Sequence, residues 1–244
     1  MDAMDAEAGR PSAPGWLLDE LAFAGRENVD DAHVGRYDTK MDGRAASEVE
    51  LLCGWGLDAA SVVVDVGAGT GQFALAVAPV CDRVIAVEVS PAMRERLRRK
   101  RDEARLDNVD VVAAGFLTYE HIGDPAHIVY SRFALHHLPD FWKVVALRRL
   151  RAMLRPRGLL RLWDIVYGFD PSEADERIEA WCAPFGDEVE GDWARWEMEE
   201  HVRDEHSTYT WLLEAMFDRT GFTVERADYS DDGFEARYLL RADA

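Results

Sequence analysis

Three glycines and two carboxylates in the first half of the chain have the spacing of a nucleoside-binding site. Residues 62–71 read VVVDVGAGTG, in which a β-branched apolar run leads directly into the glycines. Such a run predicts a buried parallel strand that turns tightly into a helix, with backbone N–H groups accessible to a ligand. A second apolar strand ends in Glu88, whose carboxylate is suited to accept hydrogen bonds from both hydroxyls of a ribose. We therefore expect the chain to bind a small molecule that carries a nucleoside.

The spacing of the glycines distinguishes a dinucleotide from other ligands that carry a nucleoside. Dinucleotide folds use G-x-G-x-x-G, in which the third glycine lets a helix pack closely beside a pyrophosphate. Here the spacing is G-x-G-x-G, and Gln72 stands where the third glycine of that pattern would fall. Asp65, two residues before the first glycine, would repel a pyrophosphate but favour an ammonium group. The residues therefore favour a ligand with a cationic group over a dinucleotide.

The pattern D-x-G-x-G-x-G at 65–71 resembles the first motif of the class I S-adenosylmethionine (SAM)-dependent methyltransferases. SAM has no phosphate and carries an ammonium group, in agreement with the charge of Asp65. The resemblance covers about 41–166 and 209–241. It implies that SAM is the cofactor and that the methyl group moves by in-line displacement to a small organic acceptor. The sequence does not identify the nucleophile of that acceptor as oxygen, nitrogen or carbon.

The resemblance also implies which residues contact the cofactor, because ligands of parallel α/β sheets lie beyond the carboxyl ends of the strands. These residues are Tyr37, Arg44, Asp65, Gly67, Ala68, Gly69, Thr70, Gly71, Glu88, Val89, Gly115, Phe116, Leu117, Ser131 and Arg132. Tyr37 and Arg44 would meet the methionine carboxylate, and Ser131 and Arg132 would lie near the methionine part.

One position departs from the family pattern. The family commonly has an acidic residue where Gly115 stands, and that acid contacts the adenine amino group. Gly115 cannot make this contact, although Phe116 and Leu117 would still sandwich the ring. This departure leaves open a SAM-binding protein without transferase activity. A second alternative, independent of Gly115, is a Rossmann-type NAD(P) oxidoreductase. Gln72 disfavours the oxidoreductase, as does the lack of evident hydride-transfer residues.

The segment VYSRFALHHLPD resembles the fourth motif region of small-molecule methyltransferases. One of its histidines, His136 or His137, would act as a general base, since imidazole titrates near neutral pH. Alternatively, HHL is a structural element that packs against and caps the following helix. Tyr37 is a third catalytic candidate, with a surface position as its alternative. Adjacent histidines do not share a helix face, so we expect no metal site from this pair.

Strands and helices alternate between residues 61 and 166, which predicts a doubly wound parallel sheet. We expect strands at 61–66, 83–88, 109–113, 127–131 and 158–166, followed by a hairpin of 222–229 and 234–241. The fold class is thus α/β: a Rossmann-like, doubly wound, mostly parallel seven-stranded sheet with a C-terminal antiparallel hairpin and a helical cap insertion.

The sequence divides into three expected regions. We expect an N-terminal segment that closes over the site at 1–40, a SAM-binding domain at 41–166 and 208–244, and a helical substrate cap at 167–207. Residues 1–15 are small, acidic and proline-bearing, and we expect them to be disordered. Trp16 to Phe23 is expected to form a short helix.

Acidic residues dominate the charge of the chain, which is −19 at pH 7. This charge argues against nucleic acid as a partner and for a small-molecule substrate. No apolar run approaches the roughly 18 residues of a membrane span, and the N-terminus does not resemble a signal peptide. Cys53, Cys81 and Cys182 are widely spaced and resemble buried free thiols. We therefore expect a cytoplasmic protein without membrane contact.

Overall fold

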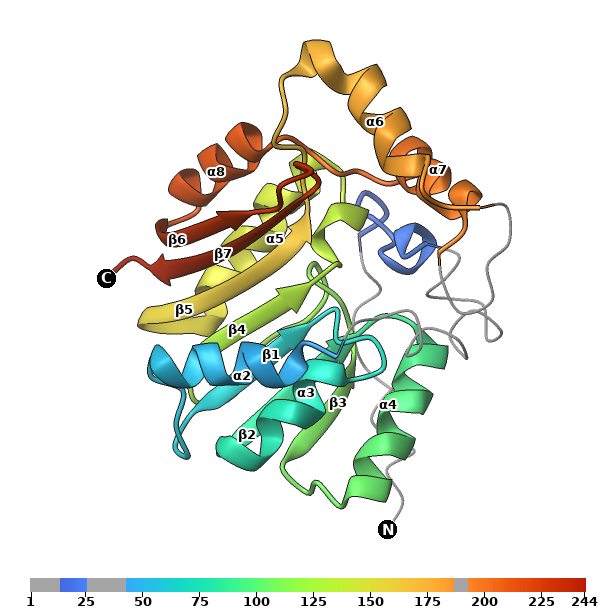
Figure 1. Cartoon of the computed structure of the whole chain (residues 1–244). Coiled ribbons are helices and arrows are strands. Elements are labelled where there is room, and N and C mark those ends of the chain that lie inside the picture. The colour runs from blue at the N-terminus through green and yellow to red at the C-terminus, as the bar shows by residue number, and fades with distance from the viewer. Residues whose placement is uncertain (1–13, 26–42, 187–192) are drawn as a thin grey trace.

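A seven-stranded sheet runs through the middle of the molecule in the order β3-β2-β1-β4-β5-β7-β6 (Figure 1). The computed structural model describes residues 14–25, 43–186 and 193–244. The strands are β1 Val62–Val66, β2 Arg83–Glu88, β3 Val109–Ala113, β4 Ala126–Arg132, β5 Leu154–Ile165, β6 Phe222–Tyr229 and β7 Glu235–Ala242. Neighbours among β1 to β5 are parallel, whereas β7 is antiparallel to both β5 and β6. The expected fold class is confirmed.

Helices cover both faces of the sheet and one of its ends (Figure 1). One face carries α2 Ala45–Gly54, α3 Gln72–Val77 and α4 Pro91–Ala104, and the other carries α5 Asp140–Met153 and α8 Thr210–Arg219. Two further helices, α6 Ala174–Cys182 and α7 Arg195–Asp204, lie beyond the end of the sheet, in the expected cap insertion. Short 3-10 turns are η1 Leu21–Phe23, η3 Ala78–Val80, η4 Leu135–His137 and η5 Pro171–Glu173. Among the described residues, no helix is both long and apolar enough to cross a membrane.

The apolar run at 62–64 in β1 reflects burial on both faces. Val63 packs into the core under α2, α3 and α4, while Val62, Val64 and Val66 belong to the core under α5 and α8. Successive side chains of a strand point to opposite faces, so a strand between two helical layers is buried at every position and mostly apolar. The charged residues within these strands, such as Asp65 and Arg161, are buried as well. Only the last turns beyond such strands are free for polar chemistry.

Three local expectations were wrong. The segment expected as a helix at 16–23 forms only the single turn η1, in which no side chain is buried. Strand β5 begins at Leu154, four residues before the expected 158, because Leu154 already pairs with Ala126. Cys53 is exposed, whereas Cys81 and Cys182 are buried free thiols as expected.

A buried ion pair joins α2 to β5. Both guanidinium nitrogens of Arg161 that face α2 donate to Glu48, with Nε–Oε2 and Nη2–Oε1 distances of 2.7 and 2.8 Å. Arg161 is 2% exposed and Glu48 5%. Such a two-point contact in a dry environment leaves an uncompensated charge when one partner is removed.

We predict that Glu48→Gln lowers the free energy of unfolding by about 3–5 kcal/mol, because it leaves the Arg161 charge buried without its carboxylate. The matched control is Glu103→Gln on the exposed i,i+4 pair with Arg99, where a change below about 0.5 kcal/mol is expected. Urea unfolding followed by circular dichroism measures both. Equal effects of the two substitutions would contradict the role assigned to the buried pair.

Candidate active site

The three glycines form the turn between β1 and α3. Their φ angles are 76° at Gly67, 53° at Gly69 and 86° at Gly71, a region that glycine adopts without strain. A Cβ at Gly67 would lie 2.3 Å from the Cβ of Ala134, and one at Gly71 would lie 2.0 Å from Leu97 Cδ1. The turn therefore packs against the segment after β4 and against α4, closer than any side chain would permit.

Glu88 ends β2 at the rim of the same turn. Its Oε2 accepts a hydrogen bond from the Gly69 N–H at 2.8 Å, and its Oε1 accepts one from the Ser90 N–H at 2.7 Å. Burial raises the pKa of Glu88, and these two hydrogen bonds oppose the rise. The bonds fix the position of the carboxylate, whose remaining lone pairs can accept from hydroxyl groups.

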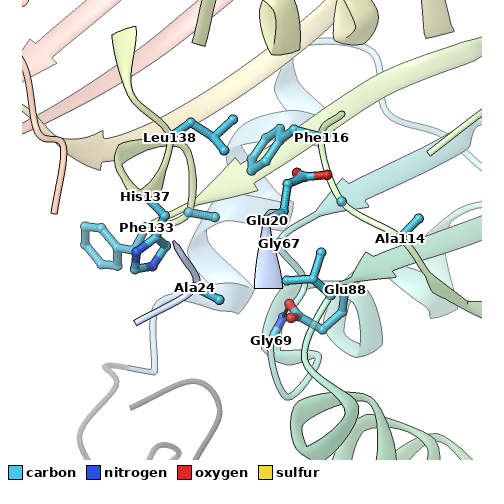
Figure 2. A pocket seen from close by; sticks show the side chains of 13 residues that line it. Glu20, Ala24, Gly67, Gly69, Glu88, Ala114, Phe116, Phe133, His137 and Leu138 are labelled. Carbon is cyan, nitrogen blue, oxygen red and sulfur yellow. Dashed lines mark hydrogen bonds between the residues drawn. The ribbon is translucent and has the colours of Figure 1, made fainter. Parts of the chain in front are cut away.

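A pocket with about 540 Å³ of empty space, part of it open to solvent, lies beyond β1, β2 and β4 (Figure 2). Its lining consists of Glu20, Ala24, Gly67, Gly69, Glu88, Val89, Ala114, Gly115, Phe116, Phe133, Ala134, His137 and Leu138. Six of the expected cofactor residues are among them: Gly67, Gly69, Glu88, Val89, Gly115 and Phe116. Bare glycine backbone, one aromatic wall and a fixed carboxylate suit a nucleoside.

A second pocket adjoins the first at Gly67, which lines both. It is lined by Ala45, Asp65, Gly67, Ala68, Thr70, Gln72, Phe73, Tyr130 and Arg132. Asp65 is 2% exposed, and burial together with the nearby charge of Glu88 raises its pKa to about 8. An acid in this state gains from a cationic group at its side. The pocket thus fits the ammonium end of an amino acid.

Three further residues that were expected near the cofactor have different surroundings: Arg132, Arg44 and Ser131. Arg132 lines the second pocket, and its guanidinium lies 3.9 Å from the ring centre of Trp163. Arg44 lies 5.5 Å from the same ring centre but is exposed and lines neither pocket. Ser131 is fully buried, and its hydroxyl donates to the Val66 carbonyl at 2.8 Å. Ser131 therefore aligns the ends of β1 and β4.

A carboxylate from the N-terminal segment meets the turn after β3. Glu20 is 8% exposed, and its Oε2 accepts hydrogen bonds from the Leu117 N–H at 3.0 Å and the Thr118 hydroxyl at 3.2 Å. The Leu117 side chain itself belongs to the core, and Phe116 lines the pocket. Sequence reasoning missed Glu20, because the contact spans 97 residues and no local motif marks it.

The histidine pair lies in η4 and separates into two environments. His136 Nδ1 is 2.5 Å from Asp164 Oδ1, and its backbone N–H donates to Asp164 Oδ2 at 3.0 Å. On its other side, His136 Nε2 is 3.1 Å from Oε2 of Glu205, which follows α7. His137 instead lines the large pocket. One histidine is thus enclosed between two carboxylates, and its neighbour faces the space for a ligand.

The charges of the two imidazoles follow from these surroundings. Burial by itself would lower the pKa of His136, but Asp164 and Glu205 raise it to about 10. Burial and the charge of His136 lower the pKa of His137 to about 3. At neutral pH, His136 is therefore an imidazolium and His137 a neutral imidazole that can accept a hydrogen bond.

The same network reaches the cap. His201 of α7 pairs with Glu205 and is 2.9 Å from the Ser207 hydroxyl through Nε2. Ligand-type atoms of His136, His201 and Glu205 lie within 4.8 Å of one another, a set of donors that divalent transition metals accept. In the structure these groups form ion pairs among themselves, and the contacts connect η4 and β5 to the cap.

Several site residues were not foreseen, and one cannot be placed. Tyr37 lies outside the described residues, so its roles remain predictions. Sequence reasoning also missed the pocket walls Ala24, Ala134 and Leu138, and the pairing of Asp164 and Glu205 with His136. The segment FALHHLPD carried a signal for the walls after β4, whereas the partners of His136 come from distant parts of the chain.

Comparison with known proteins identifies the domain. A family model described as a methyltransferase domain matches residues 63–158, from β1 into β5. An uncharacterized methyltransferase of Anoxybacillus flavithermus is 30% identical over 166 residues, which is 67% of this chain and 70% of that protein. The 27-O-demethylrifamycin SV methyltransferase of Amycolatopsis mediterranei is 31% identical over 66% of this chain and 60% of that protein. The chain spans about half the length of another curated relative that it matches.

Solved structures agree on the fold. Magnesium protoporphyrin IX methyltransferase from Synechocystis, determined with bound SAM, superposes with a TM-score of 0.59 at 14% identity, covering 95% of this chain and all of that one. The sheet order of this chain is consistent with this likeness. The chain belongs to the class I SAM-dependent methyltransferases, with SAM as its cofactor.

Proposed function

We propose that the enzyme transfers the methyl group of SAM to a hydroxyl oxygen of a small organic acceptor that binds beside His137. The observation that carries this proposal is the half-buried imidazole of His137, which lines the large pocket and is kept neutral by burial and by the charge of His136. A relative that is 31% identical is named 27-O-demethylrifamycin SV methyltransferase. That name describes a small-molecule acceptor that lacks a methyl group on an oxygen. The net charge of −19 further supports a small molecule over nucleic acid.

The two pockets suggest how the cofactor lies. The adenosine part would occupy the large pocket, with its ribose hydroxyls at Glu88 and its base along Phe116. The methionine part would extend past Gly67 into the second pocket, with its ammonium at Asp65 and its carboxylate toward Arg132. Opposite charges then face each other at both polar ends of the amino acid.

The chain's residues contribute position and a proton acceptor. When bound, SAM supplies a methyl group on a sulfonium with a good leaving group. Because an oxygen with a third bond is strongly acidic, a hydroxyl group that received this methyl group would have to lose its proton. His137 is suited to receive it even with a low pKa, while His136 stays protonated between Asp164 and Glu205. Alignment of the reacting groups contributes several kcal/mol, on the order of what intramolecular reactions gain.

Transfer of label from methyl-labelled SAM to a panel of phenols, alcohols, amines and thiols tests the function. We expect label in hydroxyl compounds. Label only in amines or thiols would overturn the assignment of oxygen, and no label in any class would favour a SAM-binding protein without transferase activity.

Glu88→Ala should weaken S-adenosylhomocysteine binding about 10- to 100-fold, since a hydrogen bond to a charged group is worth roughly 1.5–3 kcal/mol.

The state of Asp65 predicts a pH dependence of cofactor binding. Its pKa of about 8 in the free protein means that the carboxyl is largely protonated at pH 6. The cofactor ammonium favours the ionised form, so binding releases a proton and tightens as pH rises from 6 to 7.5. Calorimetry with S-adenosylhomocysteine in buffers of different ionisation enthalpy measures both effects. In Asp65→Asn the affinity should be lower and the slope between pH 6 and 7.5 shallower; an unchanged slope would contradict the role of Asp65.

If His137 accepts the proton, its substitution should lower turnover and leave cofactor binding nearly unchanged. We expect His137→Gln to lower kcat by about 10²–10⁴, the usual contribution of general acid–base catalysis, with S-adenosylhomocysteine affinity changed only a few-fold. His121→Gln is the matched control, because His121 lies outside both pockets and bonds to Tyr119 and the Asp124 carbonyl. Equal turnover of the two variants would refute the role of His137.

A further inference from the structure

Glu20 occupies the place where a side chain of residue 115 would lie. A Cβ built on Gly115 would be 2.4 Å from Glu20 Oε1 and 2.6 Å from Val89 Cγ1. Any residue other than glycine at this position would therefore displace the Glu20 carboxylate or the wall of the pocket. Glu20 and a side chain at position 115 exclude each other.

The backbone conformation at position 115 does not require a glycine. Gly115 lacks the positive φ of the glycines in the β1–α3 turn, so an ordinary residue could adopt its conformation. Its N–H donates to the Thr118 hydroxyl at 2.9 Å, a bond open to other residues as well. What requires glycine here is the space taken by the Glu20 carboxylate and by the Val89 side chain.

The Glu20 carboxylate is held from one side and faces the ligand space on another. Its Oε2 is bound by Leu117 and Thr118, and the residue lines the large pocket together with Phe116 and Glu88. Figure 2 shows its carboxylate beside the Phe116 ring, with Glu88 at the other end of the lining. The pocket thus offers two fixed carboxylates to one nucleoside, of which Glu88 suits the ribose.

We propose that Glu20 recognises the base of the cofactor by accepting a hydrogen bond from the exocyclic amino group of adenine. The N-terminal segment, through its residue 20, thereby supplies the acid that position 115 lacks. This inference rests on the placement of the adenosine part given above. It makes Glu20 a specificity-determining residue of the cofactor site.

The chemistry of the base makes the assignment selective. Adenine presents an amino donor at this edge, whereas hypoxanthine presents a carbonyl oxygen, which a carboxylate repels. Burial raises the pKa of Glu20 against the hydrogen bonds of Leu117, Thr118 and Phe116, so a further donor stabilises its ionised form. A site that offers an acceptor to an amino group discriminates strongly against an analogue without it.

A purely structural role makes a different prediction. If Glu20 only attached the N-terminal segment to the turn after β3, its removal would weaken all adenosine and inosine ligands alike. Asp19 is the matched control within this segment, because it is exposed and its carboxylate caps the N–H of Leu21 at 3.1 Å. Asp19→Ala loosens η1 without removing a group from the pocket.

The test compares S-adenosylhomocysteine with S-inosylhomocysteine by calorimetry. The wild-type chain and Asp19→Ala should prefer the adenosine ligand by about 10- to 100-fold, the range of one hydrogen bond to a charged group. In Glu20→Ala and in Glu20→Gln, whose amide can donate or accept, the preference should fall to within about threefold. The double variant Glu20→Ala/Gly115→Asp should restore it, because the acid then comes from position 115 once the Val89 side chain rotates away from the new Cβ.

The outcomes separate this inference from the proposed function. Retained preference in both Glu20 variants, or equal weakening of the two ligands, would overturn the assignment of Glu20 while methyl transfer stands. Failure of the wild-type chain to bind either ligand would overturn the cofactor placement as well. If Glu20→Ala does not fold, Glu20→Gln, which keeps the shape of the side chain, provides the same comparison.

Discussion

The close approach of the glycine turn to the segment after β4 is the contact on which both pockets depend. Gly67 comes so near Ala134 that a Cβ would lie 2.3 Å away, and it is the residue that the two pockets share. Strand β1 stands where the strand order reverses, with β2 on one side and β4 on the other. Ligands of such sheets bind at this reversal, since the connections leave in opposite directions and open a crevice. A side chain at position 67 would therefore close the crevice or push apart its walls.

The imidazolium of His136 connects the sheet to the cap and also sets the chemistry of its neighbour. Two carboxylates, Asp164 from β5 and Glu205 from beyond α7, hold it in the charged state. That charge is one reason why His137 is neutral at the pocket wall. The position of Glu205 after α7 and the charge beside His137 are thus coupled through one buried group.

The sequence was sufficient for the sheet, because its strands follow from local patterns. The residues expected to contact the cofactor at the strand ends stay predictions, and six of them line the large pocket. Apolar runs place β1 and β2, and glycines or acids directly after them give Gly67 and Glu88. It was insufficient where function depends on contacts between distant segments, as for Glu20 with Leu117 or His136 with Glu205. The departure at Gly115 was visible in the sequence, but its reason is steric and appears only with the Glu20 carboxylate in place.

Three buried carboxylates explain why this site fits SAM better than a phosphate ligand. Burial raises the pKa values of Glu20, Asp65 and Glu88 alike, so each is costly to keep ionised in the free protein. In the proposed placement, SAM offsets this cost by bringing a donor to each: an amino group, an ammonium group and a pair of hydroxyls. A pyrophosphate would add charge of the same sign. The electrostatics of the free protein therefore already discriminate in favour of SAM, before any shape is considered.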